Sequence, residues 1–166
     1  MLLIEPPRIE RFTEIPTIGI RTITPFRRML ATRDQLLGEL RHWLRTHEAD
    51  ASGYGYLRLH TVNMGGLMDL EVGAVCHERL PGDDRVRPGS LPTGTYATLT
   101  YLDHAVRANR ALLEWISENG KSLDKTVETD GDHFGCRYEE YLTDPATEPR
   151  KTRWHVRLAM RLRDSD

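Results

Sequence analysis

One short segment near the C-terminus places a carboxylate between aromatic side chains. In Tyr138-Glu139-Glu140-Tyr141-Leu142, Glu139 and Tyr141 are two residues apart, so a strand would turn both side chains to the same face. Aromatic rings beside a carboxylate suit a flat ligand that is polar or cationic, because each ring adds stacking or cation–π attraction of roughly 0.5–2 kcal/mol. The segment predicts a binding site centred on Glu139 and Tyr141. The alternative is a solvated surface glutamate.

Polar and aromatic residues alternate with aliphatic residues in other predicted strands. If helices cover the aliphatic face of the sheet, the polar and aromatic side chains point to the opposite face. We predict that the residues of this second face form one site together with Glu139 and Tyr141. The alternative is that this face is only solvated. The further members of the candidate site are Tyr56, His60, Glu71, Tyr96 and Trp154. Trp154 opens the last strand, although strict alternation places it on the helix side with Val156.

The sequence shows no spacing typical of a metal or cofactor site. His42 and His47 are five residues apart and fall on different faces of a helix. His133 has acidic neighbours at Asp130 and Asp132, but these residues complete no ligand set. We therefore predict no metal and no cofactor.

The segments that must position the candidate residues follow one order twice. In the first half we predict a strand at 18–23, a helix from Thr32 to about 47, and strands at 56–62 and 67–76. The second half repeats the order with a strand at 95–101, a helix from Asp103 to about 119, and strands at 134–142 and 153–162. Thr32 with Gln35 has the capping-box pattern, and Asp103 is a candidate N-cap.

This order indicates a duplicated βαββ unit. Leu113 follows Leu44 by 69 positions and Glu139 follows Glu71 by 68, which makes Glu71 the counterpart of Glu139. Two such units would form one antiparallel sheet with both helices on one face, an α+β fold. We predict one domain over 1–166, with repeat 1 at about 15–78 and repeat 2 at about 92–163. The alternative is a chance alignment of two αβ stretches of similar length.

Composition excludes several classes of protein. The 23 Lys and Arg residues face 25 Asp and Glu residues, so no overall positive field would hold nucleic acid. The apolar start of four residues is too short for a signal peptide, and no later apolar run reaches the roughly 18 residues of a membrane span. Two cysteines make no disulfide framework. The sequence predicts a cytoplasmic protein that binds neither nucleic acid nor membrane.

Three segments carry a resemblance to a known family. They are Pro92-Thr93-Gly94-Thr95-Tyr96, the helix end Leu113-Glu114-Trp115-Ile116, and the Glu-x-Tyr-Leu-x-Asp-Pro string at 139–145. They resemble the GyrI-like effector-binding family, a gyrase-inhibitor-like superfamily that includes ligand domains of multidrug-responsive bacterial transcription activators. The chain departs from the family pattern at Glu140, where an aliphatic residue is usual. It also has Ala159-Met160-Arg161 where a closing Ile-Pro is usual.

The resemblance implies a ligand cleft between the two repeats, lined by aromatic residues around a central glutamate. That role falls to Glu139, with Tyr141 and Tyr96 from the matching motifs and Glu71 by internal offset. The implied function is binding of bulky aromatic, often cationic, small molecules, for sensing or sequestration. No helix-turn-helix precedes the first unit, so we expect a stand-alone bacterial member of the family.

Two alternatives come with the same resemblance. Some stand-alone relatives are hydrolases that open the cyclopropane ring of DNA-alkylating natural products. In such an enzyme Glu139 and Tyr141 would act as general base and general acid around a water molecule. The family name also suggests inhibition of a gyrase-type protein partner, which no feature of this sequence supports.

Overall fold

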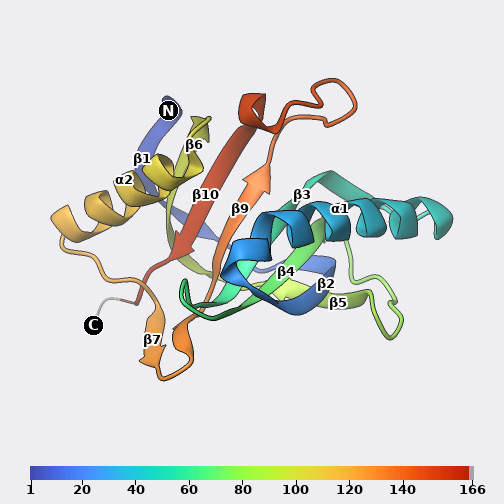
Figure 1. Cartoon of the computed structure of the whole chain (residues 1–166), viewed down its shortest axis with the longest axis horizontal. Helices are drawn as coiled ribbons and strands as arrows, with labels where there is room; N and C mark the ends of the chain where they lie inside the picture. Colours follow the sequence, from blue (N-terminus) through green and yellow to red (C-terminus); the bar gives the residue numbers. More distant parts are fainter. Residues whose placement is uncertain (165–166) are drawn as a thin grey trace.

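The computed structural model describes residues 1–164, which form ten strands, two α-helices and two short 3-10 helices (Figure 1). The strands are β1 (Leu2–Phe12), β2 (Ile15–Pro25), β3 (Ala51–Val62), β4 (Leu67–Cys76), β5 (Arg87–Leu91), β6 (Gly94–Leu102), β7 (Lys125–Glu128), β8 (Gly131–Phe134), β9 (Arg137–Tyr141) and β10 (His155–Arg161). The helices are η1 (Phe26–Arg28), α1 (Met29–Thr46), α2 (Ala105–Glu118) and η2 (Lys151–Arg153). Within this range no helix is long and apolar enough to cross a membrane.

All ten strands join one antiparallel sheet. Eight of them follow the order β1-β6-β10-β9-β3-β4-β2-β5, and the β7–β8 hairpin pairs with β3. The predicted fold is confirmed, because β2-α1-β3-β4 and β6-α2-β9-β10 each supply three neighbouring strands. The two units meet where β9 pairs with β3, and Leu57 lies opposite Glu139 in that pair.

Each unit also has a leading strand that the sequence analysis missed. β1 precedes β2 but pairs with β6, while β5 precedes β6 but pairs with β2. The units therefore hold each other at both outer edges of the sheet as well as at its centre. Pro6 and Pro7 in β1 carry no amide hydrogen. β1 tolerates them because it is an edge strand whose register shifts between Glu5 and Arg8.

Both helices lie on the same face of the sheet, as predicted (Figure 1). Their apolar stripes pack on aliphatic side chains of the central strands and form the larger core. The core members include Leu36, Leu40, Leu112 and Ile116 from the helices and Leu57, Leu70, Leu99 and Leu158 from the strands. This packing fixes α1 over the first unit and α2 over the second.

The starts of both helices differ from the prediction. α1 follows the 3-10 turn η1 and begins at Met29, so Thr32 lies inside the helix. Its hydroxyl contacts Thr24 Oγ1 at 3.1 Å instead of capping. α2 begins after His104, whose φ of 64° is left-handed, and the Asp103 carboxylate accepts a hydrogen bond from the His104 amide at 2.9 Å. In both cases the chain before the helix, rather than the cap motif, sets the first turn.

The equivalence of Glu71 and Glu139 was wrong. The predicted strand at 134–142 is divided into β8 and β9, and the second unit contains an additional β7–β8 hairpin. Leu57 and Glu139 form the central pair of the β3–β9 junction between the units. Leu57 is therefore the residue of the first unit that corresponds to Glu139. Glu71 pairs with Arg58, whereas Arg157 pairs with Glu140, so Glu71 corresponds to Arg157.

Candidate functional site

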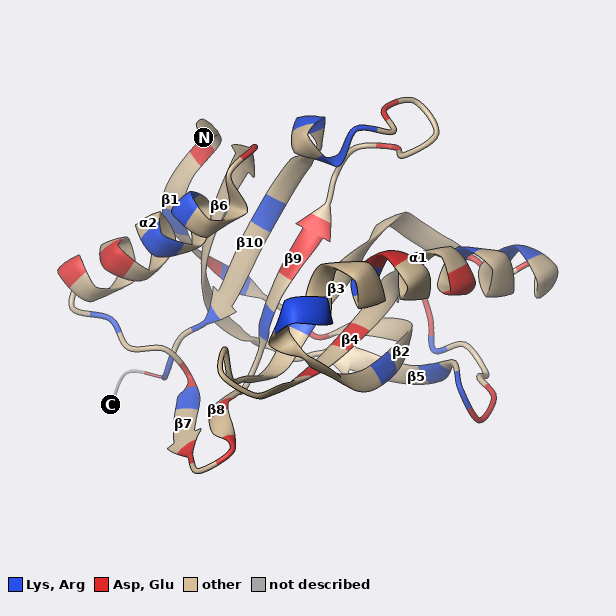
Figure 2. Cartoon of the chain, in the orientation of Figure 1, with Lys and Arg blue, Asp and Glu red and all other residues tan. Residues whose placement is uncertain are grey.

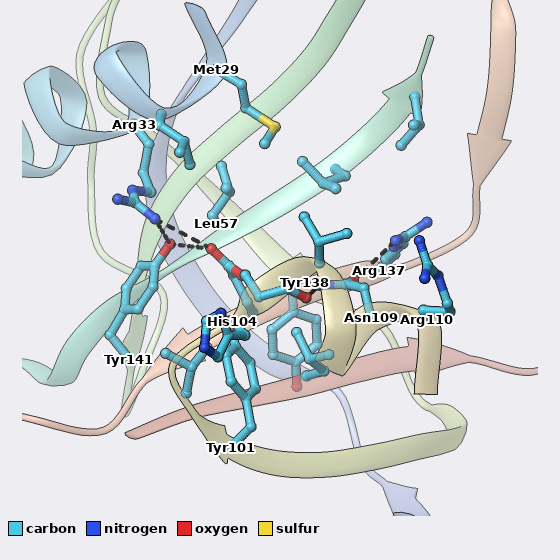
Figure 3. Close-up of a pocket in the computed structure, with 18 of the residues that line it drawn as sticks. Met29, Arg33, Leu57, Tyr101, His104, Asn109, Arg110, Arg137, Tyr138 and Tyr141 are labelled. Carbon is cyan, nitrogen blue, oxygen red and sulfur yellow. Dashed lines mark hydrogen bonds and ion pairs between the residues drawn. The ribbon is translucent and has the colours of Figure 1, made fainter. Parts of the chain in front are cut away.

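A cavity of about 490 Å³ lies on the helix face between α1 and α2 (Figure 3). Strands β3, β9 and β10 contribute Leu57, Glu139 and Leu158 to its lining, and the helices contribute Met29 and Leu113. The cavity therefore crosses the junction between the two units. Its floor lies between the two helices, because α1 packs mainly on β2 and β4 and α2 packs on β6.

Most of the cavity wall is apolar and adaptable. Four of the five methionines line it, namely Met29, Met64, Met68 and Met160. Methionine is unbranched and polarizable, so it adjusts to ligands of different outline and contacts aromatic rings favourably. The four come from separate segments, which is why no sequence motif revealed them.

The mouth of the cavity exposes large apolar side chains. Met64 is 71% exposed and Val106 is 73% exposed, and Phe26 and Leu30 are exposed beside them. They come from the β3–β4 turn, α2, η1 and α1. An exposed group of apolar side chains around a cavity is typical of a binding site.

One end of the cavity holds a carboxylate, a tyrosine and an arginine. Tyr141 Oη donates a hydrogen bond of 2.6 Å to Glu139 Oε1. Arg33 Nη1, on α1, lies 3.6 Å from the same Glu139 oxygen and 3.5 Å from Tyr141 Oη (Figure 3). The Arg33 guanidinium also lies 5.6 Å from the centre of the Tyr141 ring. Glu139 therefore already has a cationic partner within the chain.

The environment keeps Arg33 charged and the Tyr141 hydroxyl protonated. Only 12% of the Arg33 side chain and 15% of the Glu139 side chain are exposed. Burial opposes the charge of Arg33, but Tyr141, Glu139 and Asp34 outweigh it and raise the pKa of Arg33. Burial, followed by the Glu139 charge, raises the pKa of Tyr141 well above its ordinary value. The group is a charge-balanced cluster in which Tyr141 is a hydrogen-bond donor.

Two further aromatic residues complete this end. Trp154 lines the cavity, packs edge-on against Tyr141 at 5.5 Å between ring centres, and donates a hydrogen bond of 2.7 Å to the Glu148 carbonyl. Tyr101 lines it as well, and burial together with the Glu139 charge raises its pKa. Tyr101 ends a predicted strand but was not among the predicted site residues.

The other end of the cavity is basic. Arg137 Nη2 donates a hydrogen bond of 3.0 Å to Asn109 Oδ1, and its guanidinium lies 5.0 Å from the centre of the Phe134 ring. Arg110 follows Asn109 on α2 and lines the cavity too. Figure 3 shows Arg110 and Arg137 on the side of the cavity away from Arg33 and Tyr141. None of these residues was in the predicted site.

The structure does not bring the seven predicted residues together. Glu139, Tyr141 and Trp154 line the cavity on the helix face. The other four lie on the opposite face of the sheet, and they are Tyr56, His60, Glu71 and Tyr96. The prediction that placed Glu139 and Tyr141 with these four residues on the face away from the helices was therefore wrong, whereas Trp154 lies on the helix side, as strict alternation indicates.

The error has a specific cause in β9. Its sequence, Arg-Tyr-Glu-Glu-Tyr, has polar or aromatic residues on both faces and no aliphatic residue to show which face is buried. The register decides the question, because Glu139 lies opposite Leu57 on one side and Leu158 on the other. Directly opposed residues share a face, so Glu139 points to the helices.

On the opposite face, Glu71 forms a separate cluster. It accepts hydrogen bonds from Tyr56 Oη at 2.5 Å and lies 3.0 Å from His60 Nε2. Burial opposes the Glu71 charge, but the bonds from His60 and Tyr56 outweigh it and lower the pKa of Glu71. His60 and Glu71 line a polar groove with Arg21 and Asp69, which form their own ion pair at 2.8 Å. Every charged group named here is already paired.

Tyr96 is part of a small second core. It is fully buried, donates a hydrogen bond of 2.7 Å to the Pro92 carbonyl, and lies 5.0 Å from Phe12 between ring centres. Its other neighbour, Tyr138, is 6.3 Å away. Burial raises the pKa of Tyr96. Tyr96 therefore packs the sheet and does not reach the cavity.

No three His, Cys, Asp or Glu side chains within residues 1–164 are placed so that they could hold a metal ion. Both cysteines, Cys76 and Cys136, are buried and unpaired.

Solved structures with the same fold are known. The EcmrR C-terminal domain has a TM-score of 0.68 and 14% identity, covering 98% of this chain and 100% of that one. SAV2435 bound to tetraphenylphosphonium has a TM-score of 0.59 and 10% identity, covering 95% and 94%. A hydrolase from Listeria innocua has a TM-score of 0.53 and 9% identity, covering 95% and 91%. At these identities the likeness concerns the fold.

The sequence itself settles the family. Among curated proteins none matches the chain. Residues 5–163, however, match the GyrI-like small molecule binding domain, and this match includes both βαββ units, their exchanged leading strands and the cavity between the helices. The chain thus belongs to the GyrI-like small molecule binding family, as its motifs predicted.

Proposed function

We propose that the chain binds bulky aromatic small molecules in the cavity between α1 and α2. The observation that carries the proposal is an apolar cavity of about 490 Å³ whose methionine-rich wall meets a buried carboxylate and tyrosine. This volume lies within the range of pockets that take drug-sized ligands. Aromatic ligands gain most there, because thioethers and rings attract one another. Tyr141 and Trp154 supply the aromatic contacts at the carboxylate end.

We expect these ligands to include aromatic cations, whose charge Glu139 would balance. The SAV2435 structure holds tetraphenylphosphonium, a bulky aromatic cation, in a protein of the same fold. In this chain the guanidinium of Arg33 already lies beside Glu139. A cationic ligand must therefore replace Arg33, and loss of the Arg33–Glu139 attraction lowers the affinity of the cavity for that ligand.

Hydrolysis is the second candidate function. The hydrogen bond from Tyr141 to Glu139 pairs a potential acid with a potential base, and a Listeria innocua protein of this fold is described as a hydrolase. Two features favour binding over catalysis. Glu139 Oε1 already contacts Arg33 and accepts the hydrogen bond from Tyr141, so a water molecule would have to replace these partners. The raised pKa of Tyr141 makes it a poor acid near neutral pH.

A pocket-filling variant tests the proposed function. Phenylnaphthylamine is neutral, aromatic and fluorescent in apolar surroundings, and we expect the wild type to bind it. Leu59 lines the cavity, so Leu59→Trp should fill it and weaken binding at least tenfold, measured by fluorescence titration. Val127→Trp makes the same kind of change at an exposed position of β7 and should leave affinity unchanged.

The outcomes separate the two functions. Equal binding by wild type and Leu59→Trp would contradict the cavity as the ligand site. Mass spectrometry of wild type incubated with an electrophilic cyclopropane substrate distinguishes binder from enzyme. Recovery of unchanged substrate supports binding, while a ring-opened product that disappears in Glu139→Gln would establish hydrolysis.

A further inference from the structure

The charged residues of the cavity do not balance. Four basic side chains and two acidic side chains line it. Both acids have partners, because Glu139 contacts Arg33 and Tyr141, and Asp103 contacts His104. Of the basic residues, Arg33 pairs with Glu139 and Asp34, and Lys151 pairs with Asp34. Two basic residues of the lining, Arg110 and Arg137, have no carboxylate partner among residues 1–164.

Arg137 is a cation in surroundings that do not neutralise it. Its guanidinium contacts the amide oxygen of Asn109 and the face of Phe134. Burial lowers the pKa of Arg137, and the more distant charges of Glu139 and Asp132 only partly oppose this effect. A buried charge without an ionic partner is costly. An anion that entered the cavity would remove that cost and accept charge-assisted hydrogen bonds from the guanidinium.

Helix α2 adds a second positive charge beside Arg137, because Arg110 follows Asn109, the partner of Arg137. The first turn of a helix carries the positive end of its dipole and favours acidic side chains. In α2 the Asp103 carboxylate already lies just before this turn. Within the helix the basic residues lie in the N-terminal half and the acidic residues in the other half (Figure 2), and of the two basic residues Arg110 lines the cavity whereas Arg107 does not. Ala105, Val106 and Asn109 from this half line the cavity. The positive charge that α2 brings to the cavity wall is therefore that of Arg110.

We propose that the Arg137 end of the cavity is an anion subsite that binds the carboxylate or sulfonate of an amphipathic aromatic ligand, with its rings against the methionines. This inference rests on the proposed function and defines a ligand class for it. Arg137 supplies the charge-assisted hydrogen bonds, Asn109 holds its guanidinium, and Arg110 adds a second positive charge nearer solvent. An aromatic anion needs no internal pair to be broken, whereas an aromatic cation must displace Arg33.

A matched pair of dyes tests the subsite. Anilinonaphthalene sulfonate and phenylnaphthylamine share their ring system, and only the first carries an anionic group. We expect the wild type to bind the sulfonate at least tenfold more tightly, measured by fluorescence titration at low salt. The advantage should shrink as salt is added, because ions screen the attraction. Leu59→Trp should weaken both dyes, which places them in the same cavity.

Three variants locate the charge that the anion uses. Arg137→Gln should weaken the sulfonate about tenfold and change the neutral dye less than twofold. Arg110→Gln should weaken the sulfonate to a smaller extent. Arg107→Gln removes an exposed arginine from the same helix outside the cavity and should change neither dye.

The results separate failure of the subsite from failure of the proposed function. If wild type binds the neutral dye in the cavity but shows no preference for the sulfonate, the anion subsite is wrong and the proposed function stands. If Arg137→Gln and Arg107→Gln weaken the sulfonate equally, the subsite is likewise wrong. If Leu59→Trp changes the affinity for neither dye, both the proposed function and the anion subsite are wrong.

Discussion

The two faces of the sheet each carry a buried glutamate that accepts a hydrogen bond from a tyrosine. On the helix face, Glu139 bonds Tyr141 and faces Arg33 across the end of an apolar cavity. On the opposite face, Glu71 bonds Tyr56 and lies beside His60 in a polar groove. The side-chain types are nearly the same, and the surroundings are different.

The surroundings of the two glutamates offer a ligand very different surfaces. The Glu71 cluster lies beside the paired Arg21 and Asp69, and its polar groove offers little apolar surface to a ligand. The Glu139 cluster opens on methionines and leucines, where water is easily displaced. A carboxylate and a tyrosine therefore make a binding site only where an apolar cavity adjoins them.

The largest expected effect comes from Tyr96, which the sequence placed in the site and the structure places in the second core. Tyr96→Leu removes the hydrogen bond to Pro92 and the ring contact with Phe12. We expect the free energy of unfolding to fall by about 2 kcal/mol, measured by urea denaturation. Dye affinity should not change. If Tyr96→Leu instead weakened dye binding without lowering the unfolding free energy, Tyr96 would be a residue of the binding site.

The next effect distinguishes the two carboxylates. Glu139→Gln should weaken tetraphenylphosphonium by about tenfold, or about 1.4 kcal/mol, and leave the neutral triphenylphosphine oxide unchanged, measured by calorimetry. Glu71→Gln is the matched control on the opposite face and should affect neither ligand. Arg33→Met removes the internal competitor and should strengthen tetraphenylphosphonium. Equal losses in the two Gln variants would end the distinction between the faces.

The smallest effect concerns pH. The pKa of Glu71 is lowered in the folded chain, so its charge stabilises the fold above the ordinary carboxylate pKa of about 4.3. This contribution is lost as the pH falls through the lower folded-state pKa. The difference in unfolding free energy between wild type and Glu71→Gln should narrow as the pH falls below about 4. A difference that widens in acid would contradict the hydrogen bonds assigned to Glu71.

Several features could be predicted because they depend on local sequence. The order of strands and helices is fixed by hydrophobic periodicity, and Leu36, Leu40 and Ile116 are buried as their helical spacing indicates. The leading strand β1 could not be predicted as easily, because Pro6 and Pro7 weaken the strand pattern. Its pairing with the outer strand of the other unit depends on contacts between residues far apart in the chain.

The sequence by itself determined that Glu139 and Tyr141 share a face, because residues two apart in any strand do so. Only the tertiary structure decided which face that is, since β9 carries no aliphatic residue that would mark its buried side. The partners were also set by folding, which brings Arg33 from α1 to Glu139 and gathers methionines from four segments around one cavity. Side-chain alternation is a local property of the backbone, whereas register and helix packing depend on the free energy of the whole sheet.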